Sequence, residues 1–168
     1  MNLKIMTINI GMCSSLLLSA CATEEKSVVE KKETSHEGHS EHEASADVQE
    51  VTVSKEIPPN FLSGKPEDMK TIYLAVAQNK DLLEKIPCYC GCGESANHKN
   101  NYDCFIHENK QNGEVVWDDH GTKCGVCLEI AAQSILDWND GMNIKKIRKK
   151  VDEKYKSGYA KPTPTPQV

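Results

Sequence analysis

Apolar residues recur at helical spacing in the middle of the chain, ahead of a proline at position 87. Pro66, Glu67 and Asp68 open this stretch. A proline and acidic side chains are typical of a first helical turn, where the acids face the positive end of the helix dipole. We predict a helix that Asn79 separates from a short further turn. Its apolar positions are Met69, Ile72, Tyr73, Val76, Leu83 and Ile86.

Two further helices are predicted towards the C-terminus. Thr122 is expected to be the N-cap of the second helix, which Gly141 ends. Asn143 can cap the third helix in the same way. The apolar positions are Cys127, Ile130, Ala131, Ile135 and Trp138 in the second helix, and Ile144, Ile147, Val151 and Tyr155 in the third.

A short β-hairpin is predicted between the first two helices. Brief apolar runs at residues 104–106 and 115–117 flank Asn112-Gly113, which is a typical hairpin turn. The chain shows no internal repeats and no alternation of strands and helices. The pattern therefore predicts a mainly α, small cysteine-rich domain with about three helices, a cysteine loop and a short β-hairpin.

Polar segments flank this domain, which we place at residues 57–160. Residues 21–56 are rich in Glu, Lys, Ser and His and hold few large apolar side chains, so we expect a disordered tether. The alternating prolines of residues 161–168 predict an extended, solvated tail.

The N-terminus resembles a bacterial export signal. A short basic segment and an apolar run too short to span a bilayer end at Leu18-Ser19-Ala20-Cys21. This ending resembles the lipobox of bacterial lipoproteins, although a plain secretory peptide that contains Cys21 is an alternative. We expect residues 1–20 to be a signal peptide and Cys21 to carry the lipid. The protein would then be anchored to the extracytoplasmic face of the cell membrane.

Charge argues against one class of partner. The 168 residues carry a net charge of −5, so the chain as a whole gives no reason to expect nucleic-acid binding. The third predicted helix is locally basic, which could favour anionic lipid but is more typical of a solvated helix face.

The cysteines carry the strongest chemical signal. Cys88, Cys90 and Cys92 follow at every second position, and Gly91 and Gly93 between and after them allow the backbone to turn. Converging thiolates are the ligands that soft metals prefer. A CxxC pair at a helix start is a common half of such a site. The candidate metal ligands are Cys88, Cys90, Cys92, Cys104, Cys124, Cys127, His107 and His120.

Copper or zinc is the expected ion. Thiolates suit Cu(I), Zn(II) and iron–sulfur clusters, and the last are uncommon outside the cytoplasm. Zinc takes four ligands, which leaves a remainder from six thiolates unless thiolates are shared or histidines join them. His98 lies near the cysteines in sequence, but we expect it to be a surface residue. Such a protein would sequester the ion or hand it on to a partner protein.

A weaker metal signal lies in the predicted tether. His36, His39 and His42 are spaced three residues apart among acidic side chains. A histidine-rich tract of this kind could hold divalent ions loosely, or could serve only as a solubilising linker.

Two alternative hypotheses explain the cysteines without a bound metal. The six cysteines could form three disulfides that staple a small binding module. Alternatively, Cys124 could be the nucleophile of a thiol–disulfide protein and Cys127 its resolving partner, although the βαβ setting of such proteins is missing. No set of residues for hydrolysis and no phosphate-binding loop points to an enzyme.

The motif as a whole resembles a known family. Pro87-Cys88-Tyr89-Cys90-Gly91-Cys92, then Cys104, then His120-Gly121-Thr122-Lys123-Cys124-Gly125-Val126-Cys127 are similar to the PCYCGC-motif lipoproteins of Bacillus-type bacteria. The resemblance covers roughly residues 69–138. It implies a single lipoprotein domain in which these cysteines matter, and because the family is uncharacterised it implies no activity.

Overall fold

The computed structural model describes residues 47–168. The predicted signal peptide, the predicted lipidation site Cys21 and the histidines at positions 36, 39 and 42 lie outside the described residues. Within residues 47–168 no helix is long and apolar enough to cross a membrane.

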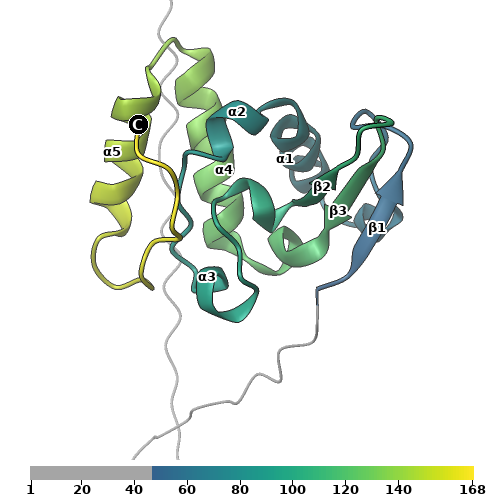
Figure 1. Ribbon diagram of the computed structural model, residues 1–168, viewed down its shortest axis with the longest axis horizontal. Coiled ribbons are helices and arrows are strands. Elements are labelled where there is room, and N and C mark those ends of the chain that lie inside the picture. Colours follow the sequence, from purple (N-terminus) through teal and green to yellow (C-terminus); the bar gives the residue numbers. More distant parts are fainter. Residues whose placement is uncertain (1–46) are drawn as a thin grey trace, which may run out of the picture. The chain divides into compact units, whose positions relative to one another are not determined.

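The described part of the chain contains five α-helices and a three-stranded antiparallel sheet (Figure 1). The expectation of a mainly α, cysteine-rich domain with a hairpin is confirmed. The helices are α1 (Glu67–Gln78), α2 (Lys80–Leu83), α3 (Cys92–Ser95), α4 (Gly125–Asn139) and α5 (Ile144–Tyr155). The strands are β1 (Gln49–Thr52), β2 (Ile106–Asn109) and β3 (Val115–Asp118), and 3-10 turns lie at Asn60–Leu62, Tyr102–Cys104 and Asp119–Lys123.

Most helices begin and end at the positions that their capping residues predicted. Asn79 separates α1 from α2, and the side chain of Asn143 accepts a hydrogen bond from the backbone of Lys146 to cap α5. The prediction for α4 was wrong by two residues, because Thr122 lies inside a 3-10 turn. The N-cap is Cys124, whose backbone is extended and whose sulfur accepts from the N–H of Cys127. A metal-ligand candidate therefore caps this helix.

The sheet includes a strand from the predicted tether. β1 pairs with β3, which lies between β1 and β2. The side chain of Thr52 is buried and accepts a hydrogen bond from the indole of Trp117 at 2.8 Å. The domain therefore begins before residue 57, which corrects the predicted boundary. The alternation of Val51, Thr52 and Val53 fits a strand, although the surrounding composition is polar.

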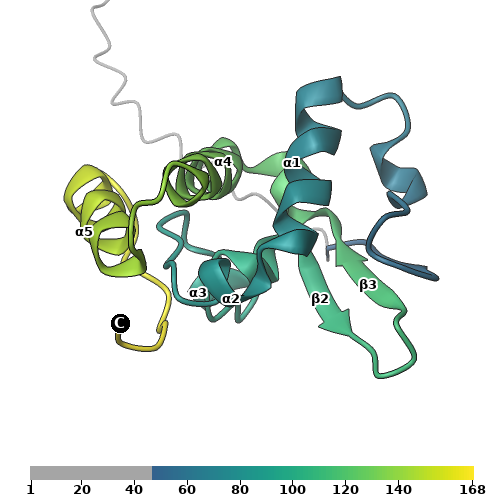
Figure 2. The ribbon, with the colours of Figure 1, turned by 90° about the horizontal axis from the view of Figure 1, so that it is seen from above.

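Aromatic packing brings the 3-10 turn at Asp119–Lys123 close to the core. The rings of Tyr73 and Phe105 meet edge to face with centroids 4.9 Å apart. A side chain at Gly121 would place its Cβ 2.6 Å from the Phe105 ring, so only glycine allows this approach. The neighbouring His120 is positioned by that contact. Figure 2 shows α4 between α1 and α5.

The proline-rich tail is only partly solvated, because it packs against the domain at two of its eight residues. Thr163 and Thr165 are buried, and the N–H of Thr163 donates to the carbonyl of Cys88 at 3.0 Å. Pro162 and Pro164 hold the backbone extended, as expected from composition, and this extended form turns the intervening threonine towards the cysteine loop. The tail is the yellow segment beside α5 in Figure 1.

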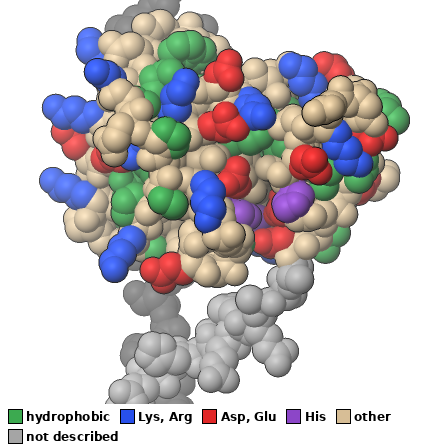
Figure 3. Space-filling view, in the orientation of Figure 1, with side chains coloured by type: hydrophobic (Ala, Val, Ile, Leu, Met, Phe, Trp, Pro, Cys, Tyr) green, Lys and Arg blue, Asp and Glu red, His purple; other side chains and the backbone are tan. Residues whose placement is uncertain are grey.

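Four of the six basic residues of α5 are paired with acidic ones. Lys and Arg side chains gather over this helix, at the left of the face in Figure 3. Lys150 contacts Asp137 at 2.7 Å, and Lys149 contacts Glu153 at 3.7 Å. The pairing fits a solvated helix face better than a surface for anionic lipid.

Candidate metal centre

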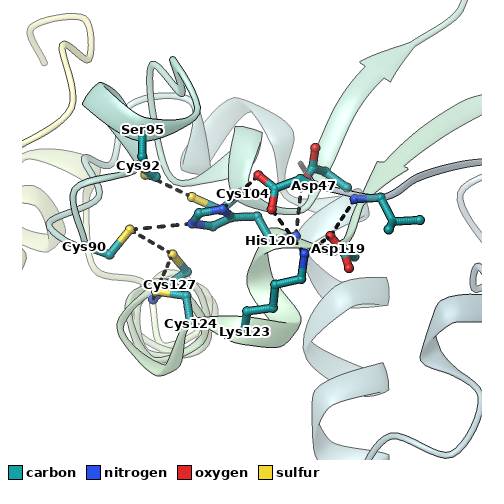
Figure 4. A network of polar contacts seen from close by, with 12 residues as sticks. Asp47, Cys90, Cys92, Ser95, Cys104, Asp119, His120, Lys123, Cys124 and Cys127 are labelled. Atoms are coloured by element: carbon teal, nitrogen blue, oxygen red, sulfur yellow. Dashed lines mark hydrogen bonds and ion pairs between the residues drawn. The ribbon is translucent and has the colours of Figure 1, made fainter. Parts of the chain in front are cut away.

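Six cysteine sulfurs lie together where the loop after α2 meets the start of α4. Cys127 is fully buried, and its sulfur lies 2.9 Å from Cys124, 3.3 Å from Cys88 and 3.4 Å from Cys90. The sulfurs of Cys92 and Cys104 are 3.6 Å apart beside this group. Figure 4 shows side chains from the loop, from the 3-10 turns and from α4 pointing towards one another.

The local backbone explains how the loop presents three sulfurs. Cys88 and Cys90 lie on an extended segment with their sulfurs 3.5 Å apart. Gly91 has a φ of 96°, a conformation that favours glycine, and it begins α3 at Cys92. The chain therefore turns after Cys90. Cys92 lies next to Cys104, which is the last residue of the 3-10 turn Tyr102–Cys104.

The start of α4 supplies the other two sulfurs. Cys124 caps the helix and Cys127 lies one turn further on, where the N–H of Cys127 donates to the Cys124 sulfur at 3.3 Å. The unpaired N–H groups at a helix N-terminus favour negative charge, and therefore favour thiolate over thiol. The CxxC pair is held in an environment suited to metal-ligating sulfur.

His120 connects the cysteines to Asp47, which lies just before β1. Its Nε2 lies 3.8 Å from the Cys90 sulfur, and its Nδ1 lies 3.0 Å from the Asp47 carboxylate. The sulfurs of Cys124 and Cys90, together with Asp47, raise the pKa of His120 to about 11. A carboxylate at Nδ1 orients an imidazole so that Nε2 is available as a ligand. Asp47 was not predicted as a site residue because it lies 73 positions from His120.

His98 belongs to the cluster, contrary to the expectation that it lies on the surface. Only 8% of it is exposed, and its ring meets that of His120 with centroids 4.8 Å apart. Its Nδ1 is buried without a hydrogen-bond partner. Burial, and after it the neighbouring His120, lower the pKa of His98. A neutral imidazole with a free buried nitrogen is suited to bind a metal.

His107 is the predicted ligand that the structure leaves out. It is exposed on β2, at an irregularity in the pairing of β2 with β3 between Ile106 and Glu108. None of the described groups of three or more metal-binding side chains contains it. An irregularity of this kind redirects a side chain, so closeness to Cys104 in sequence does not bring His107 near that sulfur in space.

The close packing of the sulfurs shifts the pKa values of the thiols in opposite directions. The neighbouring Cys104, and after it Cys124 and Cys127, lower the pKa of Cys90. The same contacts, with Cys104 and then Cys124, raise the pKa of Cys127. So many buried thiols cannot all ionise beside one another without a compensating cation. A bound metal ion would supply that charge.

The donor set fits a metal ion in its chemistry, and a bound ion would move the sulfurs slightly apart. Tetrahedral zinc has sulfur bonds of about 2.3 Å, which places its sulfur ligands about 3.8 Å apart. The sulfur contacts here are 2.9–3.6 Å, somewhat shorter than that spacing. All six cysteines are free thiols. Metal-binding groups with their ligand atoms within 4.8 Å of one another include Cys90, His120, Cys124 and Cys127, and Cys92, His98, Cys104 and His120.

Comparison with known proteins identifies a family but no activity. The sequence model of a family described as "Protein of unknown function with PCYCGC motif" matches residues 10–168. No curated protein and no solved structure matches the chain.

Proposed function

This chain belongs to the PCYCGC-motif family, and we propose that it binds a soft or borderline metal ion, Cu(I) or Zn(II), through its thiolate cluster. The observation that carries the proposal is the convergence of six free thiols with His98 and His120. Thiolate and imidazole ligands together suit these two ions better than they suit Mg²⁺ or Ca²⁺. The same donors would hold the ion for sequestration or for transfer.

Transfer is favoured by an accessible side of the cluster. Cys88, Cys104 and Cys127 are fully buried, whereas Cys90 and Cys124 are half-buried. A metal ion could therefore reach the cluster, or leave it, past the half-buried pair. A partner protein with its own thiolates could take the ion there by ligand exchange.

Elemental analysis of anaerobically purified protein tests the proposal. We expect copper or zinc together with free thiols that react only after the metal is removed. Metal should also stabilise the fold, by about 2.7 kcal/mol at a free concentration 100 times the dissociation constant. Replacing Cys90 with Ser should remove most of this stabilisation, and Ser95→Ala, at the end of the neighbouring helix α3, is the control.

The alternative of a disulfide-stapled module gives the opposite result. Three disulfides would leave no free thiols after denaturation, and metal-free oxidised protein would then be as stable as metal-loaded protein. That result would contradict metal binding and favour the stapled module.

A lipid anchor is part of the same proposal. Cys21 follows Leu18-Ser19-Ala20 in the order of a lipobox, so we propose that it is lipidated and holds the domain at the extracytoplasmic face of the membrane. Replacing Cys21 with Ala should release the protein into the soluble fraction or leave it unprocessed. Continued membrane attachment of that variant would contradict the anchor.

A second candidate function rests on the closeness of Cys124 and Cys127. Their sulfurs are 2.9 Å apart at the N-terminus of α4, a place that favours a nucleophilic thiolate. A thiol–disulfide protein would reduce a model disulfide with its CxxC in the dithiol form, or oxidise a model dithiol with its CxxC in the disulfide form, and Cys124→Ser would abolish both activities. The antiparallel sheet differs from the βαβ setting of thioredoxin-like proteins, which ranks this candidate second.

A further inference from the structure

The number of donors in the cluster equals the need of two tetrahedral ions. The six cysteines and the two clustered histidines give eight donors, and a structural zinc ion takes four. We propose, resting on the proposed function, that the centre holds two Zn(II)-type ions, each bound by three cysteines and one histidine. We name the donors the helix set (Cys90, His120, Cys124 and Cys127) and the loop set (Cys88, Cys92, His98 and Cys104).

The helix set is built around the start of α4. Its four ligand atoms lie within 4.8 Å of one another. Cys127 contacts Cys124 at 2.9 Å and Cys90 at 3.4 Å, and Cys90 contacts the Nε2 of His120 at 3.8 Å. Because Asp47 engages the other nitrogen of His120, Nε2 is the ligand atom. Three sulfurs and one nitrogen complete one tetrahedral site.

The loop set is built around Cys92, His98 and Cys104, which adjoin His120. Ligand atoms of Cys92, His98, Cys104 and His120 lie within 4.8 Å of one another. With His120 assigned to the helix set, the fourth ligand of the loop set is Cys88. Its sulfur lies within 4.8 Å of that of Cys104 in one group and of that of Cys92 in another. The loop set therefore also has three sulfurs and one nitrogen.

His98 is the residue that points to a ligand in the loop set. A buried polar atom without a partner costs free energy, in the range of about 1–3 kcal/mol. The Nδ1 of His98 is such an atom, in a side chain that is only 8% exposed. Coordination to an ion between Cys92 and Cys104 would satisfy it. From the sequence, His107 was expected to be the second histidine ligand beside His120, but His98 is the one that lies in the cluster.

The two sets meet at Cys88. Its sulfur lies 3.3 Å from Cys127 and 3.5 Å from Cys90, both of which belong to the helix set. Cys88 therefore lies at the boundary between the two sets, and its contacts keep the two ions close to one another. Nitrogen in each set favours a borderline four-coordinate ion, because Cu(I) clusters are built from sulfur alone more readily than from mixed donors.

Metal counting on the full chain tests this inference. Wild-type protein loaded with Zn²⁺ under anaerobic conditions should hold two ions, and Cd²⁺-loaded protein should give two ¹¹³Cd resonances. His98→Gln should hold one ion and lose one resonance, and Cys124→Ser should lose the other. His107→Gln, which changes an exposed histidine in the same way, should keep both.

Each other outcome has a defined meaning. One ion in the wild type, or two ions in His98→Gln, would overturn the inference while leaving metal binding intact. No bound ion in the wild type would overturn the proposed function as well. X-ray absorption of the zinc-loaded wild type needs no variant, so misfolding of a variant cannot affect its result. We expect an average of about three sulfurs and one nitrogen per ion. A shell of sulfur alone would also overturn the inference.

Discussion

Thr163 and Cys88 are joined by two hydrogen bonds across 75 positions of the chain. The N–H of Cys88 donates to the Thr163 hydroxyl at 2.9 Å, and the N–H of Thr163 donates to the Cys88 carbonyl at 3.0 Å. The C-terminal tail thereby holds the backbone of the first cysteine of the motif. The position of the Cys88 sulfur depends on residues that composition alone assigns to a solvated end.

Replacing Thr163 with Val tests the contribution of this contact. The buried N–H of Cys88 would lose its acceptor, and we expect the free energy of unfolding to fall by about 1–3 kcal/mol. Thr163→Ser keeps the hydroxyl and is the control. Denaturant unfolding of the metal-free, reduced protein measures the difference. Equal stability of Thr163→Val and wild type would show that the tail does not support the loop.

Replacing Asp47 with Asn should weaken metal binding without removing it. Asp47 orients the His120 ring through Nδ1, and the loss of such a partner typically reduces metal affinity about 10- to 100-fold. Competition with a chromophoric chelator measures the affinity. Lys123→Gln removes the other ion-pair partner of Asp47, at 3.4 Å, and should leave the affinity nearly unchanged.

Replacing Thr52 with Val tests whether β1 is part of the domain. The Trp117 indole N–H is buried and donates to the Thr52 hydroxyl at 2.8 Å. Without that acceptor the fold should lose about 1–3 kcal/mol, and Thr52→Ser should restore most of it. Unfolding followed by tryptophan fluorescence measures the change. If Thr52→Val unfolds as the wild type does, β1 contributes little to stability.

Acid should release the metal. A cysteine binds a metal as thiolate, so binding expels the thiol proton, and apparent affinity must fall as the pH falls. The raised pKa of Cys127, caused first by Cys104 and then by Cys124, means that this thiol is protonated before metal arrives. Zn²⁺ affinity measured at several pH values should therefore rise with pH. Affinity that stays constant with pH would contradict thiolate ligation.

Local signals in the sequence were sufficient to predict most of the helices. Asn79 and Asn143 act on their immediate neighbours, so their effects can be read from spacing alone. The strand β1 and the buried tail were missed because their partners lie far along the chain, β3 for the strand and the cysteine loop for Thr163. Both segments are polar in composition, which predicts exposed residues, although individual threonines in them are buried.

The choice between histidines failed for a related reason. His107 lies three positions from Cys104, but an irregular pairing of β2 with β3 leaves it exposed. His98 follows α3 and turns inwards to meet His120. Closeness to a cysteine in sequence therefore favours the wrong histidine as a ligand. The conformation of the loop and the pairing of the strands decide which imidazole lies in the cluster.

Contacts from both ends of the described domain also determine when the centre can be completed. Asp47 engages His120 from one end, and Thr163 engages Cys88 from the other. During synthesis the cysteines emerge before the tail that holds their loop. An ion that binds early would meet an unfinished, loosely held set of thiols. Tight binding should therefore appear only after the last residues have been made, which delays metal uptake until the whole domain is present.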